Sequence, residues 1–372
     1  MKKYRLAAPC LFGVEGILAD ELRRMGAENV SAENGRVFFE GGDDIIARAN
    51  IRSRFAERIL IVLGSFEART FTELFDSVKA LPLEDYISAE NAFPVNGDSL
   101  NSTLHSIPDC QSIIKKAVVE RLKTKYHIDR FPETGAKIQL RFFILKDKAT
   151  LMIDTSGRGL HKRGYRAVSN DAPIKETLAA AMCDQARIYP DTQVYDPFCG
   201  SGTILIEAAM MAAHIAPGLH GFFAAEKFDF ISPEAWKRER EAAYSEVDTD
   251  VEFHGFGYDI DPACVELSRS NAEKAGVSKL LTFKTADIRD FCGFEGRGLV
   301  ITNPPYGERL LDVNAAEELY GVMGEKFVQE RGKKYFIISP HDEFEHFFGR
   351  PADKRRKLYN GMIKCQLYMY FR

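Results

Sequence analysis

The sequence lacks the residue patterns that mark membrane, secreted and metal-binding proteins. Its seven cysteines are scattered and form no Cys-x-x-Cys pair, so neither a zinc site nor a disulfide framework is indicated. No apolar run reaches the roughly 18 residues needed to cross a bilayer, and no apolar stretch of signal-peptide length follows the basic N-terminus. We therefore expect a cytoplasmic protein without a bound metal ion or a membrane segment.

The sequence also lacks an overall excess of positive charge. Its 372 residues carry a formal net charge of −4, which argues against a uniformly basic nucleic-acid-binding protein. Residues 115–166, however, contain 14 lysines and arginines against 5 aspartates and glutamates, a surplus of 9. Solvated helix faces and a bound anionic partner explain such a surplus equally well. With 45% apolar and 28% charged residues, the chain is otherwise typical of a globular protein of two or three domains.

The first half of the chain is predicted to form two small α+β modules. Residues 1–65 show alternating helical and strand patterns, which are typical of a ferredoxin-like layer. Residues 66–155 contain a helical segment, an amphipathic helix with a basic face at 113–122, and two alternating runs that indicate a β-hairpin. Residues 156–171 are rich in glycine and basic residues, and we interpret them as a linker.

From residue 172 to residue 372 the pattern changes to alternating strands and helices. Short runs that indicate strands lie at 192–195, 253–258, 281–284, 298–302 and 334–338. Such alternation predicts an α/β domain with a parallel, doubly wound, Rossmann-like sheet. Residues 214–250, which contain Trp236 and many charges, lengthen one connection and are interpreted as a helical insertion.

The segment Tyr195-Asp-Pro-Phe-Cys-Gly-Ser-Gly-Thr203 joins a predicted strand to a predicted helix. This is the edge at which open α/β sheets bind ligands. The segment matches neither the Gly-x-Gly-x-x-Gly fingerprint nor the P-loop, so nothing in it indicates a pyrophosphate site. Gly200 and Gly202 would let a ligand approach the backbone, and the Asp196 carboxylate suits a ligand that bears an ammonium group. A purely structural turn is the alternative.

Two further carboxylates follow the next predicted strands. Asp259 suits both hydroxyls of a ribose, with Asp261 in reserve, although Pro262 favours a helix N-cap as the role of Asp261. Asp287 suits the exocyclic amine of adenine, but a capping role explains it equally well. Together these residues describe a pocket for an ammonium group, a ribose and an adenine without phosphates. That combination describes S-adenosylmethionine (SAM).

The segment VITNPPYGER, from Val300 to Arg309, places a rigid corner at the end of a buried strand. Two successive prolines interrupt sheet and helix alike and remove two backbone donors. The Asn303 amide oxygen and the Pro304 carbonyl can then accept two hydrogen bonds from one NH2 group, while Tyr306 stacks on the base that carries it. Catalysis would be mainly a matter of positioning. A paired base cannot reach such a corner, so the target base must be unpaired or flipped out.

Four motifs in this order resemble a known family. They are Leu160-His-Lys-Arg-Gly-Tyr-Arg166, Ala172-Pro-Ile-Lys-Glu176, Asp196-Pro-Phe-Cys-Gly-Ser-Gly-Thr203 and Asn303-Pro-Pro-Tyr-Gly-Glu-Arg309. They resemble the THUMP-domain, class I SAM-dependent RNA guanine-N2 methyltransferases, and in particular the N-terminal methyltransferase half of the bacterial 23S rRNA enzymes. The resemblance implies a ferredoxin-like module at 1–65, a THUMP RNA-binding module at 66–155, a linker at 156–171 and a methyltransferase domain at 172–372. It also implies N2-methylguanosine as the product.

The motifs and the resemblance together nominate candidate residues for each role. Those expected to bind the cofactor are Asp196, Phe198, Gly200, Gly202, Thr203, Asp259, Ile260 and Asp287. Those expected to act in catalysis are Asn303, Pro304, Pro305 and Tyr306. Those expected to contact RNA are Lys115, Lys116, Lys123, Lys162, Arg163 and Arg166. The resemblance also places Lys175 and Thr177 on a helix beside the cofactor.

Three alternatives stay open. A tRNA-directed sister group has the same modules as the 23S rRNA enzymes. An adenine-N6 DNA methyltransferase would use the same Asn-Pro-Pro-Tyr corner, but the RNA-type modules argue against it. An RNA-binding protein with an inactive methyltransferase fold is the third, and the intact motif residues argue against that reading.

Overall fold

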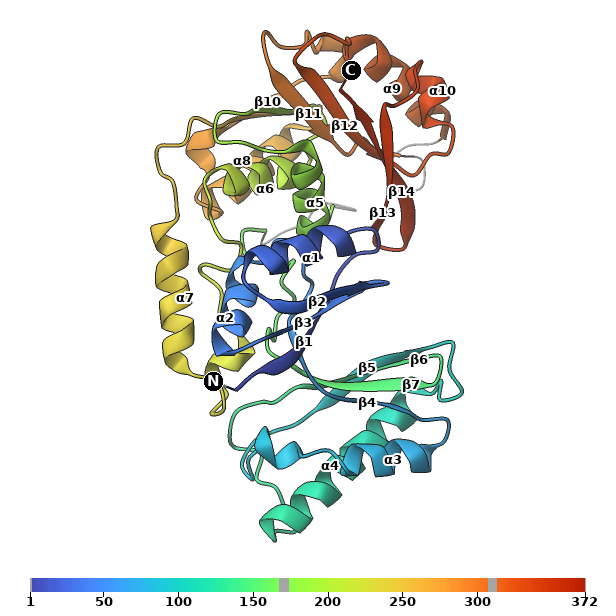
Figure 1. Cartoon of the computed structure of the whole chain (residues 1–372). Helices are drawn as coiled ribbons and strands as arrows, with labels where there is room; N and C mark the ends of the chain where they lie inside the picture. Colours follow the sequence, from blue (N-terminus) through green and yellow to red (C-terminus); the bar gives the residue numbers. More distant parts are fainter. Residues whose placement is uncertain (1, 167–173, 307–312, 372) are drawn as a thin grey trace.

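Two seven-stranded β-sheets organise the residues that the structure describes, which are 2–166, 174–306 and 313–371 (Figure 1). The structure is a computed structural model. The N-terminal half of the chain forms one sheet and the C-terminal half forms the other, and the chain passes from the first to the second after residue 154. Within the described ranges, no helix is long and apolar enough to span a bilayer.

The first sheet runs continuously through both N-terminal modules, in the order β2-β3-β1-β4-β7-β6-β5. Its strands are β1 (Tyr4–Pro9), β2 (Glu28–Glu33), β3 (Arg36–Gly41), β4 (Leu60–Glu67), β5 (Val95–Leu100), β6 (Leu140–Leu145) and β7 (Lys148–Asp154). Strand β4 pairs with β1 at Leu60 and Ile61 and with β7 from Leu60 to Glu67. The division expected between residues 65 and 66 therefore falls inside a strand that both modules share.

Helices cover the first sheet and pack against it through their apolar faces. They are α1 (Glu15–Arg24), α2 (Asp43–Arg52), α3 (Phe71–Lys79) and α4 (Ile107–Tyr126), with a short 3-10 turn η1 (Leu83–Asp85). Thr70 and Glu73 form a capping box that starts α3, because each side chain satisfies the other's backbone N–H. Helix α4 is longer than the expected 113–122: Pro108 lies in its first turn and His127 ends it in the left-handed conformation.

The second sheet has the order β10-β9-β8-β11-β12-β14-β13. Its strands are β8 (Gln193–Asp196), β9 (His254–Asp259), β10 (Leu281–Thr285), β11 (Gly298–Thr302), β12 (Lys333–Ser339), β13 (Lys354–Asn360) and β14 (Ile363–Tyr370). The strands from β10 to β12 are parallel, which confirms the expected doubly wound α/β class, whereas β14 and β13 are antiparallel and were not predicted. The chain order reverses between β9 and β11, on either side of β8, and such a reversal is where α/β folds bind ligands.

The helices of this domain are α5 (Glu176–Ala186), α6 (Thr203–Ala212), α8 (Pro262–Lys274), α9 (Val313–Lys326) and α10 (Phe344–Phe348), with 3-10 turns η3 (Ser278–Leu280) and η4 (Ile288–Asp290). The expected insertion forms η2 (Ala224–Lys227) and α7 (Pro233–Ser245). Figure 1 shows α7 in yellow beside α2 in blue. Arg48 of α2 holds Glu239 of α7 with two hydrogen bonds of 2.8 Å, so the insertion fastens the second domain to the first.

Candidate active site

A cavity of about 580 Å³ opens at the carboxyl ends of β8, β9, β10 and β11. It brings together all of the cofactor and catalytic candidates named from the sequence except Gly202, and its wall includes Asp196, Phe198, Gly200, Thr203, Asp259, Ile260, Asp287, Asn303, Pro304, Pro305 and Tyr306. These residues come from four separate strand ends. Because parallel strands end at one edge of a sheet, segments more than 100 positions apart in sequence meet in one place.

Asp196 lies at the end of β8 with its carboxylate buried. Its Oδ1 accepts hydrogen bonds from the Thr302 hydroxyl at 2.6 Å and from the Phe198 backbone N–H at 3.1 Å. Burial raises the pKa of this carboxyl to about 7, with a contribution from the negative charge of Asp259, although both hydrogen bonds act to lower the pKa. A cationic ligand group beside Asp196 would therefore favour its charged form.

Asp259 connects the two loops that frame the cavity. Its Oδ2 accepts from the Gly200 N–H at 2.9 Å, and its Oδ1 accepts from the Asp261 N–H at 3.0 Å. Each carboxylate oxygen retains a lone pair that can accept from a ligand hydroxyl. Asp261 caps α8 by accepting from the Ala263 N–H at 2.8 Å, as the capping reading of Asp261 predicted.

Two side chains of helix α8 donate hydrogen bonds to the backbone of the glycine loop. The Ser268 hydroxyl donates to the Gly200 carbonyl at 2.8 Å, and the Asn271 amide donates to the Ser201 carbonyl at 3.0 Å. Gly202 has a φ of +77°, and a Cβ there would lie 3.1 Å from Ser268, so this glycine shapes the loop instead of lining the cavity. Sequence reasoning missed Ser268 and Asn271, because nothing in a helix interior marks which residues face a distant loop.

Asp287 has two roles in this geometry. It lines the cavity, and it also caps η4 by accepting from the Arg289 N–H at 2.8 Å, so the capping alternative describes part of its role. The Arg289 guanidinium lies 3.2 Å from Asp287 and 3.1 Å from Glu318 of α9. Arg289 and Glu318 both line the cavity and were not predicted.

The Asn-Pro-Pro-Tyr corner follows β11 directly and forms one wall of the cavity. The Tyr306 ring is buried, and its hydroxyl accepts a hydrogen bond of 3.1 Å from Asn360 at the end of β13. Sequence reasoning missed Asn360; its only local signal is the Asn-Gly pair of a hairpin turn. The rest of this motif, 307–309, and the first two residues of the motif at 172–176 lie outside the described residues.

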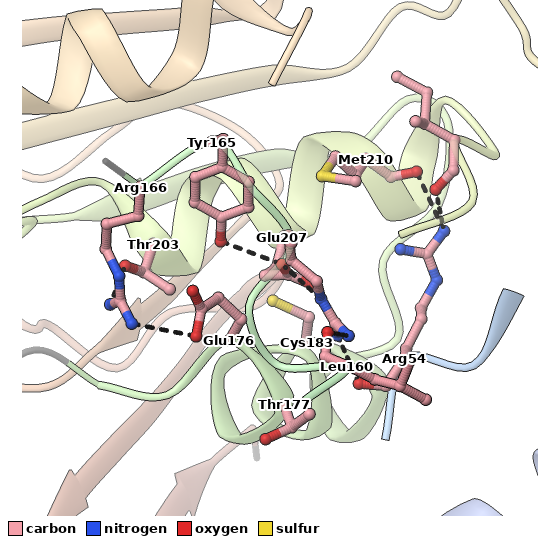
Figure 2. A network of polar contacts seen from close by, with 12 residues as sticks. Arg54, Leu160, Tyr165, Arg166, Glu176, Thr177, Cys183, Thr203, Glu207 and Met210 are labelled. Carbon is pink, nitrogen blue, oxygen red and sulfur yellow. Dashed lines mark hydrogen bonds and ion pairs between the residues drawn. The ribbon is translucent and has the colours of Figure 1, made fainter. Parts of the chain in front are cut away.

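The motif at 160–166 builds the junction between the domains (Figure 2). Arg163 is buried and donates to the Leu160 carbonyl at 2.7 Å and the Arg54 carbonyl at 2.6 Å, and its Nε lies 3.4 Å from Glu207. The Tyr165 hydroxyl donates to the same Glu207 oxygen at 3.0 Å; burial and the Glu207 charge raise the pKa of Tyr165 far above its usual value. The expectation that Arg163 contacts RNA is corrected, because its guanidinium is enclosed in the protein.

Arg166 also turns inward. Its guanidinium donates to Glu176 at 3.0 Å, to the Ile174 carbonyl at 3.0 Å and to the Thr203 hydroxyl at 3.4 Å, next to the glycine loop (Figure 2). The structure therefore places Arg166 against the glycine loop, and its expected contact with RNA stays a prediction. The remaining RNA candidates separate into two places: Lys115, Lys116 and Lys123 lie on α4, and Lys162 lies on the linker. Lys115 also pairs with Glu133 at 2.9 Å.

Lys175 and Thr177 contact the N-terminal domain instead of the cavity. The Thr177 hydroxyl donates to Glu57 at 2.7 Å, and Lys175 and His161 lie 3.4 and 2.8 Å from the same carboxylate. Burial alone would raise the pKa of Glu57, but hydrogen bonds from His161 and Thr177 and the Lys175 charge outweigh it and hold that pKa at about 2.

Neither a metal centre nor a disulfide is seen in the described part of the chain. No group of three or more His, Cys, Asp or Glu side chains there could hold a metal ion. None of the cysteines among these residues forms a disulfide.

Comparisons with known families match the whole length of the chain. The profile described as "RMKL-like, methyltransferase domain" matches residues 163–369, the "RlmL ferredoxin-like domain" matches 5–60 and the "THUMP domain" matches 68–154. The "Putative RNA methyltransferase YpsC" of Bacillus subtilis is 43% identical, with 100% of this chain and 97% of that protein aligned. The "Ribosomal RNA large subunit methyltransferase K/L" of Syntrophotalea carbinolica is 36% identical over 95% of this chain, which spans about half, 52%, of that relative's length.

Solved structures match equally well. The structure of SMU.472, described as "a putative methyltransferase complexed with SAH", has a TM-score of 0.95 and 42% identity, with 100% of this chain and 98% of that chain covered. A structure from Listeria monocytogenes, described as "a predicted N6-adenine-specific DNA methylase", has a TM-score of 0.93 and 44% identity, covering 100% of this chain and 97% of that chain.

Proposed function

The chain belongs to the RMKL-like, THUMP-containing class I methyltransferases that use SAM, and on that premise we propose that it methylates N2 of a guanine in large-subunit ribosomal RNA. The observation that carries the proposal is the Asn-Pro-Pro-Tyr corner, which shares one cavity with the carboxylates of Asp196 and Asp259. A site for an exocyclic amine thus lies beside a site for the cofactor.

The cavity fits SAM by the chemistry of its walls. Asp196 offers a buried carboxylate to the cofactor's ammonium group, and Asp259 offers two oxygens with free lone pairs to the ribose hydroxyls. Arg289 is the one cation among the described wall residues, and Asp287 and Glu318 already neutralise it, so no cation there remains for a phosphate. When bound, SAM supplies a methyl group that its sulfonium already activates.

The corner's own groups would hold the target amine. Asn303 offers an amide oxygen and Pro304 a carbonyl oxygen, while Pro304 and Pro305 present no competing N–H group. Two accepted hydrogen bonds would fix the NH2 group with its lone pair toward the methyl donor, so that most of the acceleration comes from orientation. The hydrogen bond from Asn360 would keep the Tyr306 ring in place for stacking on the base.

Such a cavity admits a base only after the base has left its helix. The corner lies at the end of a buried strand, and duplex RNA cannot bring the edge of a paired base to it. We therefore propose that the guanine is flipped out, with the THUMP module and Lys115, Lys116 and Lys123 of α4 holding the flanking RNA. A ribosomal RNA substrate would place the reaction in the cytoplasm.

Ribosomal RNA is favoured because curated relatives aligned over nearly all of this chain are named large-subunit methyltransferases. A tRNA guanine is the second candidate, since the same modules suit both RNAs. The name given to the Listeria structure keeps an adenine of DNA as a third candidate. The THUMP module argues against DNA, because no DNA-reading motif accompanies it.

Labelling separates these candidates. Purified protein and radiolabelled SAM would be incubated with large-subunit RNA, tRNA and DNA from cells that lack this gene, and each fraction would be digested to nucleosides. We expect labelled N2-methylguanosine in the large-subunit RNA, and far less of it with Asn303→Ala. The same nucleoside in tRNA would mean that tRNA is the substrate, and the proposed reaction on guanine N2 would stand. Label in the adenine of DNA alone would overturn the proposal.

A further inference from the structure

A second cavity, of about 510 Å³, lies at the junction of the domains, and the proposed chemistry does not use it. We call it the junction pocket. The end of α2, the linker, the loop that follows α6 and the end of α8 form its wall, with Ser53, Lys162, Ile215 and Lys274 as representatives of these segments. It thus lies between the domain that carries the THUMP module and the domain that carries the active site.

The junction pocket is basic and has no acidic side chain among its described wall residues. Arg158, Lys162 and Lys274 are exposed, and none of them makes an ion pair or a side-chain hydrogen bond in the described structure. Arg163 also reaches the wall, but its charge is balanced by Glu207 behind it. Scattered surface lysines are normally just solvated; here three unneutralised cations from two segments face one concavity.

The linker holds its cations on a fixed backbone. Its side chains alternate: His161, Arg163 and Tyr165 point inward to Glu57 and Glu207, whereas Lys162 between them is exposed. Figure 2 shows Tyr165 of the linker pointing toward Glu207. Before Arg158, the Asp154 carboxylate accepts from the Ser156 and Gly157 N–H groups at 3.0 Å each, which fixes the turn. A preorganised cation loses less entropy when it binds an anion.

An aromatic ring completes the pocket. Phe222, from the loop that follows α6, lines it and is 88% exposed. Proteins commonly bind single-stranded nucleic acid with cations that contact the phosphates and an aromatic ring that stacks on a base. An exposed ring beside a basic pocket has this arrangement.

We propose that the junction pocket binds the backbone of the RNA substrate, with Arg158, Lys162 and Lys274 contacting phosphates and Phe222 stacking on an unpaired base. This inference rests on the proposed function, since its ligand is the RNA that becomes methylated. Helix α8 connects the two sites: Cys264 lines the active-site cavity and Lys274 lines the junction pocket. Ten helical residues span roughly 15 Å, which a strand of about five stacked nucleotides covers.

Binding measured without methyl transfer tests the pocket. Fluorescence anisotropy would follow a labelled single-stranded 20-nucleotide RNA between about 50 and 200 mM salt for the wild type, the double variant Lys162→Ala/Lys274→Ala, and Phe222→Ala. Lys279→Ala is the matched control: this exposed lysine follows α8 closely but is not a wall residue. SAM binding by calorimetry would verify that each variant is folded.

We expect the double variant to bind RNA about tenfold more weakly at 50 mM salt, and its salt slope to fall by about 0.7 for each lost phosphate contact. Phe222→Ala should lose about tenfold in affinity with an unchanged slope. If the double variant and Lys279→Ala bind alike, the inference is wrong. A wild type that binds RNA through the pocket but methylates none would instead refute the proposed function alone.

Discussion

The Thr302 hydroxyl donates a hydrogen bond of 2.6 Å to the buried carboxylate of Asp196. Thr302 ends β11, immediately before the proposed amine-binding corner, and Asp196 ends β8, at the start of the proposed cofactor loop. One contact thus fixes the donor side of the cavity relative to the acceptor side. Methyl transfer depends on that distance, because orientation supplies most of the proposed acceleration.

Cofactor affinity is expected to depend on pH through Asp196. Because the pKa of this carboxyl is raised to about 7, it is largely neutral below pH 7 and cannot pair with the cofactor's ammonium group. Affinity for SAM should therefore rise about tenfold between pH 6 and pH 8 and then level off. Calorimetric titrations at pH 6, 7 and 8 measure it. Thr302→Val removes a hydrogen bond that lowers this pKa, so the midpoint should move to higher pH; an unmoved midpoint would contradict the assignment.

Asp259→Ala is expected to lower the affinity for the cofactor far more than it lowers the stability of the fold. The substitution removes the acceptor of the Gly200 and Asp261 N–H groups together with the proposed ribose contact. With about 1.5–3 kcal/mol for each hydrogen bond to a charged group, we expect the SAM dissociation constant to rise at least about 100-fold. Calorimetry gives that constant. Asp261→Ala is the control, because it removes the cap of α8 and a neighbouring wall carboxylate but leaves the Asp259 carboxylate in place; similar losses for both variants would argue against the ribose role of Asp259.

Asn303→Ala is expected to keep cofactor binding and to lose most of the activity. It removes the side-chain acceptor that we propose for the target amine, and it leaves the Asp196 and Asp259 carboxylates in place. Single-turnover rates should fall at least about 100-fold, or roughly 3 kcal/mol of transition-state stabilisation. Asn360→Ala loosens Tyr306 without touching the amine, so its loss should be smaller. Near-normal turnover by Asn303→Ala would refute the amine-holding role.

Glu207→Ala is expected to destabilise the whole chain. Glu207 is fully buried, and its removal leaves the Arg163 guanidinium charged without its carboxylate partner. Removing one partner of a buried ion pair typically costs about 3–5 kcal/mol in the free energy of unfolding. Urea denaturation measures this free energy. The control is Lys237→Ala, which breaks the exposed Lys237–Glu241 pair and should cost about 0.5 kcal/mol or less. Equal losses would mean that the junction contributes no stability.

Local sequence patterns predicted the features that depend on neighbouring residues. The parallel strands, the glycine loop and the Asp261 cap each follow from a few adjacent positions, such as Pro262 after Asp261. The antiparallel β13 and β14 were not predicted, since an edge hairpin after a parallel sheet leaves only a short Asn-Gly signal.

Contacts between distant residues were beyond the same reasoning. The charges at 162–166 indicated a solvent-exposed basic segment, yet Arg163 pairs with Glu207, 44 positions later, and becomes buried. Tyr306 receives its hydrogen bond from Asn360, 54 positions later. Whether an arginine faces water or a buried carboxylate depends on the packing of two domains, and one sequence position carries no sign of it.

The junction also determines the order in which this chain can be completed. Arg54 belongs to the half that leaves the ribosome first, but it donates to the carbonyls of Met210 and Ile215, 156 and 161 positions later. Until those residues emerge, the Arg54 guanidinium of the nascent N-terminal half lacks these two acceptors. The N-terminal half therefore completes these junction contacts only after residue 215 has been synthesised, and the second sheet follows later still, because its strands β9 to β14 begin at residue 254.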